Sequence, residues 1–326
     1  MIVHLVVPAD LADRPTGGNV YDRHLRAALV ARGWEVIAHR VRPDEVTHAA
    51  AALPAGSTVL VDSLVASWAP EAFLDAPVRV VPLVHMIFDV PGERELLADA
   101  PVVITTSEWT RHVLLRRHLD PHRVQVATPG VGRVLPGVGS DAGDELLCVA
   151  TLTPAKGHDV LLAALGELTD LAWTCTLVGS TDADRPFVDQ LRRQAAEAGI
   201  SDRMRVVGEL SRADLHATYR SSDLALLPSR AETYGMVVTE AIAHGLPVVA
   251  SSVGGVAEAV GTVGDHRPAL LVRPGDPELL ARSVRRWLED PPLRRQLRHV
   301  VRARRATLPT WEATAAAVAI AVEPLR

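Results

Sequence analysis

Residues 224–260 constrain what this chain can fold into more than any other stretch. An apolar run of four residues at 224–227 precedes a polar loop, and the spacing of apolar residues at 236–244 fits a short helix closed by glycine and proline. A second apolar run follows at 248–250. Strand, loop, helix and strand in this order predict a βαβ unit of a parallel sheet. Ligands of such sheets bind beyond the carboxyl ends of the strands, which here means residues 229–236.

Two glutamates and the start of a helix suit this loop to binding a phosphate and sugar hydroxyls. The amides of residues 235–237 open the predicted helix, where unpaired N–H groups and the helix dipole favour a phosphate. Glu240 lies one turn further along and could accept hydrogen bonds from the two hydroxyls of a ribose. Glu232 could accept hydrogen bonds from sugar hydroxyls in the same way. Either glutamate alone is better explained by a solvated surface position, so the pair has to be judged with its surroundings.

Composition indicates a globular chain of two domains. Its 326 residues exceed the usual size of a single core, and 48% of them are hydrophobic. A net charge of −5 argues against a general nucleic-acid binder. No apolar run reaches the roughly 18 residues of a membrane span and no signal peptide precedes the first strand, so we expect a cytoplasmic protein. Cys148 and Cys175 lie in apolar runs and are expected to be buried thiols rather than a disulfide or a zinc site.

Apolar runs alternate with helical patterns on both sides of a break at residues 133–145. The break is rich in Gly, Pro, Ser and Asp without periodicity, which is typical of a linker. The pattern predicts strands at 2–7, 35–38, 58–61, 78–84, 102–105 and 124–127 before the break, and at 146–150, 173–178, 205–207, 224–227, 248–250 and 269–272 after it. We therefore expect two α/β domains, each built on its own parallel sheet.

The first loop of each half carries residues suited to a phosphate. Thr16, Gly17 and Gly18 precede a helix predicted to start two residues later, and a glycine pair lets the backbone approach a ligand closely. Lys156 and Gly157 hold the same place in the second half. Lys156 is the one lysine among 34 Lys and Arg residues, and its flexible ammonium can reach a diphosphate. An ordinary flexible loop is the alternative, and the incomplete glycine pattern disfavours an NAD-dependent dehydrogenase.

His85 and an Asp-x-Asp string are two further candidates. His85 directly follows the apolar run at 78–84, where a parallel sheet delivers site residues, although a lone histidine is more often structural. Asp182 and Asp184 could hold a divalent metal, but two close aspartates in a polar turn more often cap a helix or are solvated. We expect no metal site there.

The residues around the two glutamates, taken together, resemble the motif of a known family. LPSR comes first, seven residues separate Glu232 from Glu240, and HGLPVVAS and a glycine pair follow. This string resembles the Glu-x7-Glu signature of retaining glycosyltransferases of family 4. The resemblance implies the α/β GT-B fold, in which two Rossmann-like, doubly wound parallel-sheet domains face a central cleft. Residues 1–137 would then bind the acceptor, residues 138–308 would bind the nucleotide sugar, and a helix in 309–326 would cross back to the first domain.

The resemblance also implies a role for individual residues. Glu240 would bind the nucleotide ribose, Glu232 would contact the transferred sugar near its 3- and 4-hydroxyls, and His85 would orient that sugar near its reacting carbon. The family pairs an Arg with a Lys five residues later; Lys156 matches the Lys, but Thr151 stands at the Arg position, and Arg230 is a candidate substitute. Catalytic roles are implied for His85, Lys156 and Glu232, and the expected donor-binding set is Gly17, Gly18, Thr151, Lys156, Gly157, Arg230, Glu232, Tyr234, Gly235, Met236, Val237 and Glu240.

The function implied by this resemblance is transfer of a sugar, with retention of configuration, from a nucleoside diphosphate sugar to an acceptor hydroxyl. UDP and GDP are the default donors of the family, no metal or other cofactor is expected, and a lipid, a natural product or a glycan could be the acceptor. The basic face of residues 108–118 could contact a membrane from the cytoplasmic side, although a solvated helix explains it as well. A nucleotide-sugar epimerase, a phosphorylase and a catalytically weak partner subunit that binds nucleotide sugars remain alternatives.

Overall fold

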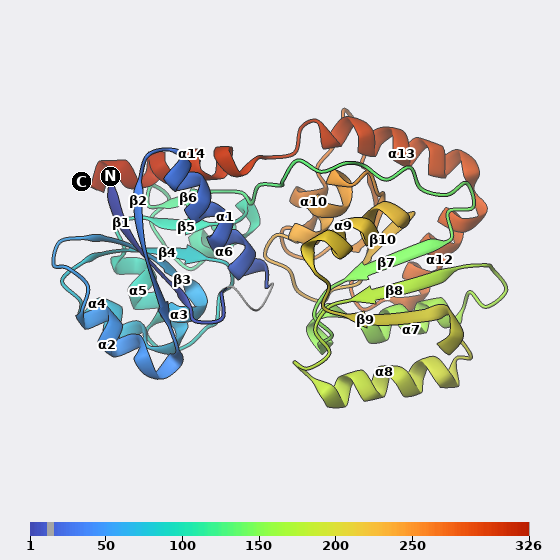
Figure 1. The fold of residues 1–326 in the computed structure, drawn as a ribbon, viewed down its shortest axis with the longest axis horizontal. Coiled ribbons are helices and arrows are strands. Elements are labelled where there is room, and N and C mark those ends of the chain that lie inside the picture. Colours follow the sequence, from blue (N-terminus) through green and yellow to red (C-terminus); the bar gives the residue numbers. More distant parts are fainter. Residues whose placement is uncertain (12–15, 326) are drawn as a thin grey trace. The chain divides into compact units, whose positions relative to one another are not determined.

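A computed structural model describes residues 1–11 and 16–325 and divides the chain into two compact units. Unit 1 consists of Met1–Gly130 together with Pro309–Arg326, and unit 2 of Val131–Leu308. Each unit is an α/β layer structure with one parallel sheet of six strands (Figure 1). The expected pair of parallel-sheet α/β domains is therefore confirmed.

The sheet of unit 1 has the strand order β2-β1-β3-β4-β5-β6, and every pairing is parallel. Its strands are β1 (Ile2–Pro8), β2 (Glu35–Val41), β3 (Thr58–Asp62), β4 (Arg79–Val84), β5 (Val103–Thr105) and β6 (Val124–Val126). Asp62, the last residue of β3, pairs in register with Leu83 of β4. This register brings the carboxyl ends of β3 and β4 to the same level, and His85 follows β4 directly.

Helices cover both faces of this sheet (Figure 1). They are α1 (Gly17–Ala31), α2 (Val46–Ala51), α3 (Ser63–Trp68), α4 (Pro70–Leu74), α5 (Glu93–Asp99), α6 (Glu108–Arg116) and α14 (Trp311–Val322). The helix α1 begins earlier than expected, because the Thr16 hydroxyl caps it by accepting the Asn19 amide at 3.2 Å. Gly17 and Gly18 therefore form the first turn of the helix and do not lie in a loop before it.

The C-terminal helix α14 packs against α1 within unit 1. Trp311 stacks on His24 with ring centroids 4.7 Å apart and meets the ring of Tyr21 edge-on at 5.7 Å. The Thr314 hydroxyl donates to the carbonyl of Thr128 at 2.7 Å. Gly130 lies so close to this helix that a β-carbon there would be 2.2 Å from the Trp311 amide nitrogen.

The sheet of unit 2 has the order β12-β11-β10-β7-β8-β9 and is also parallel. Its strands are β7 (Glu145–Val149), β8 (Thr174–Val178), β9 (Met204–Gly208), β10 (Leu224–Leu227), β11 (Val248–Ser251) and β12 (Ala269–Val272). Its helices are α7 (His158–Gly166), α8 (Arg185–Glu197), α9 (Arg212–Ser221), α10 (Met236–Ala243), α11 (Val256–Val260), α12 (Pro277–Glu289) and α13 (Pro291–Arg305).

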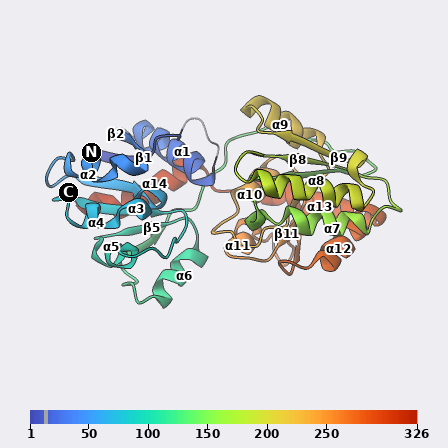
Figure 2. The same cartoon turned by 90° about the horizontal axis from the view of Figure 1, so that it is seen from below.

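Alternate residues of these strands face two separate apolar layers. Leu224 and Leu226 of β10 pack with α7, α8 and α12, whereas Ala225 and Leu227 pack with α9, α10 and α11. Figure 2 shows helices on both sides of the sheet. The fully apolar run at 224–227 is thus explained by burial of both faces. Cys148 and Cys175 are buried free thiols of this core, as expected.

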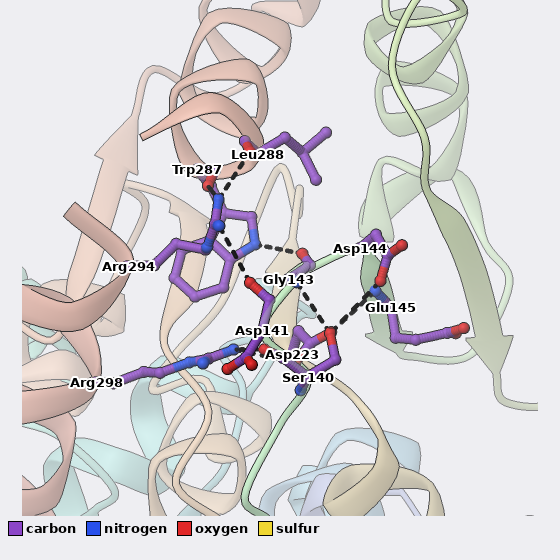
Figure 3. A network of polar contacts seen from close by, with 10 residues as sticks. All are labelled: Ser140, Asp141, Gly143, Asp144, Glu145, Asp223, Trp287, Leu288, Arg294 and Arg298. Atoms are coloured by element: carbon purple, nitrogen blue, oxygen red, sulfur yellow. Dashed lines mark hydrogen bonds and ion pairs between the residues drawn. The ribbon is translucent and has the colours of Figure 1, made fainter. Parts of the chain in front are cut away.

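The break at residues 133–145 is held firmly along its second half (Figure 3). The buried carboxylate of Asp223 accepts the Ser140 amide at 2.5 Å, the Ser140 hydroxyl at 2.7 Å and the Glu145 amide at 3.1 Å. The indole of Trp287 donates to the carbonyl of Gly143 at 2.7 Å, and Arg294 bonds the carbonyl of Asp141. A segment that lacks periodicity is therefore fixed by side chains from three distant parts of unit 2.

Across the described residues, every helix falls short of the length and apolar character that crossing a bilayer requires.

Replacing Gly130 by alanine should loosen the packing of α14. The added methyl group would overlap the backbone at Trp311, which is not free to move away as a flexible side chain is. We expect a loss of about 1–3 kcal/mol in the free energy of unfolding, measured by chemical denaturation. Gly132→Ala is the matched control, because the nearest atom to its added carbon is the end of the Arg212 side chain at 3.6 Å. Equal stability of the two variants would contradict this packing argument.

Candidate functional site

The residues singled out in the sequence gather at the carboxyl ends of the strands. Lys156 lies in a short 3₁₀ turn, Pro154–Lys156, beyond β7, and Glu232 lies in the loop beyond β10. β7 and β10 are neighbours in the sheet of unit 2, so two loops that are distant in sequence meet at one edge. His85 occupies the equivalent edge of the sheet of unit 1.

Lys156 and Glu232 form a direct ion pair. The ammonium Nζ lies 2.7 Å from Oε1 of Glu232, and the Ser229 hydroxyl donates to the same oxygen at 2.8 Å. The Lys156 side chain is 30% exposed and that of Glu232 is 13% exposed, so the pair is shielded but open to a ligand on one side. An ammonium has three N–H donors, so the bond to Glu232 leaves two for other acceptors.

Two glycines allow these loops to touch through their backbones. Gly157 has a φ of +68°, and a β-carbon there would lie 2.1 Å from the carbonyl oxygen of Pro228. Gly254 has a φ of +51°, and a β-carbon there would lie 1.6 Å from the carbonyl oxygen of Glu232. Both positions therefore require glycine for conformation and for space. Gly157 brings the Lys156 turn against Pro228, which directly follows β10. Gly254 packs against the backbone of the loop that carries Glu232.

Arg230 is bonded to the turn that carries Lys156. Its guanidinium bonds both carboxylate oxygens of Asp159 at 2.7 and 2.8 Å and the carbonyl of Pro154 at 2.6 Å. Its amide also donates to the carbonyl of Ala155 at 2.8 Å. Burial alone would raise the pKa of Asp159, but the bonds from Arg230 outweigh it and hold the pKa below its usual range. Arg230 thus fixes the turn that presents Lys156.

Thr151 is uncharged and so cannot act as the cation that the resembled pattern has at this position. It follows β7 as a half-buried residue, and its carbonyl accepts the Thr153 amide at 2.9 Å. The ammonium of Lys156 faces the Glu232 loop, while the guanidinium of Arg230 bonds Asp159.

Glu240 lies on the first turns of α10 with a tyrosine holding its carboxylate. The Tyr219 hydroxyl donates to Oε2 of Glu240 at 3.2 Å. Burial raises the pKa of Glu240, while the bond from Tyr219 and the charge of Arg212 lower it in part. Tyr219 itself is buried and stacks on His244 with ring centroids 4.5 Å apart. The side chain expected to bind a ribose is therefore oriented from behind by a rigid aromatic ring.

Two histidines behind Glu240 are locked into neutral forms by their contacts. Nδ1 of His244 lies 2.8 Å from the carbonyl of Glu240, so this nitrogen carries the proton. Its Nε2 must then accept from Nδ1 of His216, which lies 2.8 Å away, and Nε2 of His216 accepts from Arg212 at 3.3 Å. Burial and the neighbouring groups lower the pKa of His244 to about 4. The chain of bonds thus ends at the backbone of the helix that carries Glu240.

The start of α10 has the geometry expected for an anion. Gly235 precedes it with a φ of +92°, no side chain caps the helix, and Met236 and Val237 form its first turn. Tyr234 is buried against the underlying core, and burial raises the pKa of its hydroxyl. The amides of the first turn and the carboxylate of Glu240 are consequently presented by one short helix.

In unit 1, His85 is bonded to an aspartate of α1. Its Nε2 lies 2.8 Å from Oδ1 of Asp22, and Asp62 lies beside both at the end of β3. A β-carbon at Gly18 would lie 3.2 Å from Cδ2 of His85, so this glycine lets the helix start close against the ring. Burial would lower the pKa of His85, but Asp22 and Asp62 more than offset it and raise the pKa to about 9.

Within the described residues, Asp22, Asp62 and His85 are the group whose ligand atoms could hold a metal ion, all within 4.8 Å of one another. Each of the three residues already has a bonded atom: Nε2 of His85 bonds Oδ1 of Asp22, and Oδ1 of Asp62 accepts the Leu64 amide at 2.7 Å. That the reaction needs no metal stays a prediction. At the Asp-x-Asp string, Asp184 caps α8 by accepting the Phe187 amide and Asp182 pairs with Arg185, which confirms the capping interpretation.

Comparison with known proteins places the chain in a family. Residues 140–304 match the model of the glycosyl transferases group 1. The chain belongs to this family. Among curated relatives of this group 1 chain are the D-inositol 3-phosphate glycosyltransferases of Salinispora arenicola (strain CNS-205) and Frankia alni (strain DSM 45986 / CECT 9034 / ACN14a). Both are 33% identical, over 69% and 70% of this chain and 55% and 60% of their own lengths. The chain thus spans little more than half of the relatives that it matches.

Two solved structures share the GT-B fold of this chain over almost their full length. Sucrose-phosphate synthase from Thermosynechococcus elongatus superposes with a TM-score of 0.83 at 22% identity, covering 100% of this chain and 99% of that one. Anabaena Alr3699/HepE in complex with UDP-glucose gives a TM-score of 0.83 at 18% identity, covering 99% and 100%. The GT-B fold expected from the sequence is confirmed. Membership of family 4 stays a prediction.

Several residues at these strand ends were not predicted from the sequence to belong to the site. They are the partners of the predicted ones: Asp22, Asp62, Asp159, Tyr219, Ser229 and Gly254. Asp62 ends an apolar strand, and Gly254 belongs to the glycine pair that follows the signature, so both carried a signal. The position of Tyr219 on a helix before β10 carried none.

Asp62→Asn should change how stability depends on pH. Burial and the charge of Asp22 raise the pKa of Asp62 from 3.8 to about 7, so the folded chain binds more protons than the unfolded chain between these values. Stability therefore falls as the pH rises through this window. Asparagine abolishes the effect while keeping the cap on Leu64.

We expect the stability of Asp62→Asn relative to the natural chain to increase from pH 4 to pH 7 and then to level off, measured by urea denaturation at a series of pH values. Asp44→Asn, at a side chain that is 77% exposed, serves as control and should show no such trend. A flat difference for Asp62→Asn would rule out the raised pKa.

Proposed function

We propose that this chain transfers a sugar from a nucleoside diphosphate sugar to an acceptor hydroxyl with retention of configuration. The observation that carries the proposal is the pairing of Lys156 with Glu232 at 2.7 Å, on the loops beyond β7 and β10, with Glu240 on the helix that follows. This arrangement suits a diphosphate beside the ammonium, a ribose beside Glu240 and a transferred sugar beside Glu232.

Electrostatics and positioning would supply the catalysis. As the glycosyl bond breaks, negative charge grows on the diphosphate, and the Lys156 ammonium and the amides opening α10 are donors suited to it. Because Ser229 and Lys156 both donate to Oε1 of Glu232, this carboxylate is held as an acceptor for sugar hydroxyls and is poorly suited to act as a nucleophile. The leaving phosphate itself would then take the proton of the acceptor hydroxyl.

A uridine nucleotide is the first donor to test. The Anabaena protein that shares the fold has been solved with UDP, with UDP and glucose, and with UDP-glucose. Calorimetry with UDP and GDP, followed by turnover with the matching sugars, decides the base. D-Inositol 3-phosphate, which the names of the relatives contain, is the first acceptor probe, and nuclear magnetic resonance of the product reports whether the anomeric configuration is retained.

A catalytically weak partner subunit is the second candidate. It is favoured by the absence of a cation at Thr151 and by the engagement of Arg230 with Asp159, which leave Lys156 to neutralise the diphosphate. Tight nucleotide binding without turnover on any donor and acceptor of the panel would support this candidate. Formation of an epimer from donor alone, or turnover onto phosphate, would instead indicate the epimerase or the phosphorylase.

Membrane contact of α6 is a further prediction. Arg111 of α6 bonds the carbonyl of Val124 at 3.1 Å, and Arg117, which directly follows the helix, pairs with Asp89. Trp109 is 39% exposed. Co-sedimentation with vesicles that contain anionic lipid tests the contact directly.

Glu240→Ala should weaken donor binding, and Tyr219→Phe should do so to a smaller extent. Loss of the carboxylate removes a charged acceptor for the ribose, which corresponds to a ten- to hundredfold rise in Kd, or about 1.5–3 kcal/mol. Loss of the hydroxyl only frees the carboxylate to rotate, which corresponds to a rise of about three- to tenfold. Calorimetry with UDP checks both values. An unchanged Kd for Glu240→Ala would contradict the assignment of the ribose.

Lys156→Ala should lower kcat more than it weakens donor binding. The ammonium is needed most when charge develops on the leaving group, so we expect a loss of about 10²–10³ in kcat and less than about tenfold in donor Kd. Glu232→Ala should affect both parameters. Because Lys156→Ala also leaves Glu232 unpaired, the same change is made in a Glu232→Gln background as control. Equal effects on kcat and Kd would contradict a role in the transition state.

A further inference from the structure

Unit 2 has a cavity of about 350 Å³ at the edge of its sheet, which the proposed sugar transfer does not use. Its lining comes from three places: Arg267, residues 269–271 of β12, and Arg282, Ser283 and Arg286 of α12. β12 is the last strand of its sheet, so its outer side has no neighbouring strand. Three of the lining residues are arginines and none is acidic. In a chain with a net charge of −5, the cavity is a local concentration of positive charge.

The charges of these arginines are hardly compensated by the protein itself. Among residues 1–11 and 16–325, the side chains of Arg267 and Arg286 take part in no ion pair or hydrogen bond. Arg282 lies 3.7 Å from Glu278, but the two side chains are 64% and 74% exposed, and such a pair contributes little. Arg285, on another face of α12, instead bonds both carboxylate oxygens of Asp170 at 2.7 and 2.8 Å. The helix thus pairs the arginine that faces away from the cavity and leaves those at the cavity to other partners.

Two elements bring the three guanidinium groups to one space. Arg282 and Arg286 are four residues apart on α12, so they lie on the same face of the helix. Ser283 beside them is small, and its hydroxyl donates to the carbonyl of Leu279 at 2.9 Å, within the helix. Arg267 reaches the same cavity from the segment before β12. A guanidinium is a planar fork of N–H donors that matches two oxygens of a phosphate, so this grouping favours a phosphate.

The free edge of β12 adds backbone donors to the cavity. The carbonyls of Pro268 and Val272 accept the amides of β11 and of the residue after it, at 3.4 and 2.8 Å. Because successive residues of a strand direct their backbone groups to opposite sides, the N–H groups of Ala269 and Leu271 point away from β11. Both residues line the cavity. Outward N–H groups at the edge of a sheet are suited to an anion, in addition to the arginines.

We propose that this cavity binds a multiply charged phosphate, either pyrophosphate or a phosphate ester. Three cations and the N–H groups of a sheet edge face one space that holds no acidic side chain. The cavity is larger than a single phosphate group, so it also has room for a second phosphate or a small organic remainder. No aromatic residue lines it, so it offers no ring on which a nucleobase could stack. A nucleotide is therefore not the ligand that this lining favours.

The cavity and the residues of the proposed sugar transfer lie at different ends of the sheet. Arg267 precedes β12 and so lies at the amino end of this strand, whereas Lys156 and Glu232 follow the carboxyl ends of β7 and β10. All strands of the sheet are parallel, so their carboxyl ends point the same way. A phosphate held by Arg267 is thus separate from a diphosphate held by Lys156. The two can be measured independently, and the inference does not depend on the proposed function.

Calorimetry of the full chain with pyrophosphate at low ionic strength tests the site. We expect saturable binding that Arg286→Gln weakens about tenfold and that the double variant Arg267→Gln/Arg286→Gln abolishes, because each change removes a charged donor. Both side chains are exposed, so the variants should fold like the natural chain. Arg273→Gln is the matched control, since Arg273 is an exposed arginine directly after β12 that does not line the cavity. It should bind pyrophosphate as the natural chain does.

Lys156→Ala separates this site from the proposed donor site. Binding in the cavity should persist in Lys156→Ala, and any second pyrophosphate site that only this variant loses belongs to the loops that carry Lys156 and Glu232. If no sugar transfer is found with any donor, the proposed function fails, while the pyrophosphate titration still decides the cavity.

Vesicles that contain phosphatidic acid, whose headgroup is a phosphate monoester, distinguish a lipid from a free phosphate as the source. Binding of either probe that requires Arg267 and Arg286 supports the inference. It is overturned if neither millimolar pyrophosphate nor the vesicles bind saturably, or if the double variant binds as the natural chain does. Equally tight binding of a polyglutamate peptide would also overturn it, because the cavity would then select negative charge and not phosphate.

Discussion

The edge of unit 2 that carries Lys156 and Glu232 depends on one close contact between backbones. Gly157 touches the carbonyl of Pro228 so closely that no β-carbon fits, and this contact joins the turn after β7 to the loop after β10. Arg230 strengthens the junction by bonding Asp159 and the carbonyl of Pro154. Only because the two loops meet can Lys156 reach Glu232, which lies 76 residues away in the sequence. The charges of the site are therefore placed by backbone geometry first and by their mutual attraction second.

In both units the charged groups are paired before any substrate arrives. Lys156 is bonded to Glu232, Arg230 to Asp159 and His85 to Asp22. Pairing of this kind lowers the conformational freedom of long side chains, so little reorganisation is needed when charge develops in a reaction. It also means that removing one member leaves the other uncompensated, so single substitutions overstate the contribution of the residue that is removed.

Strand ends could be predicted from the sequence, whereas the partners of the side chains there could not. Apolar runs bounded by polar loops located the strands and placed His85, Lys156 and Glu232 at their ends. The bond between Arg230 and Asp159 could not be predicted, because it depends on how two loops fold together, and the role suggested for Arg230 toward a donor stays a prediction. The helix α13 was not anticipated, since two prolines and many arginines hide its apolar stripe and Arg294 and Arg304 are themselves buried.

Two histidines of this chain show that the residue type alone does not determine the protonation state of a side chain. His85 and His244 are both largely enclosed, yet neighbouring groups raise the pKa of His85 to about 9 and lower that of His244 to about 4. Two carboxylates face the first ring, whereas a carbonyl, a second imidazole and nearby arginines face the other. One histidine is therefore suited to donate to an anion, and the other is suited to pass a hydrogen bond to the backbone of α10. A sequence pattern finds both residues, but only their surroundings assign each its protons.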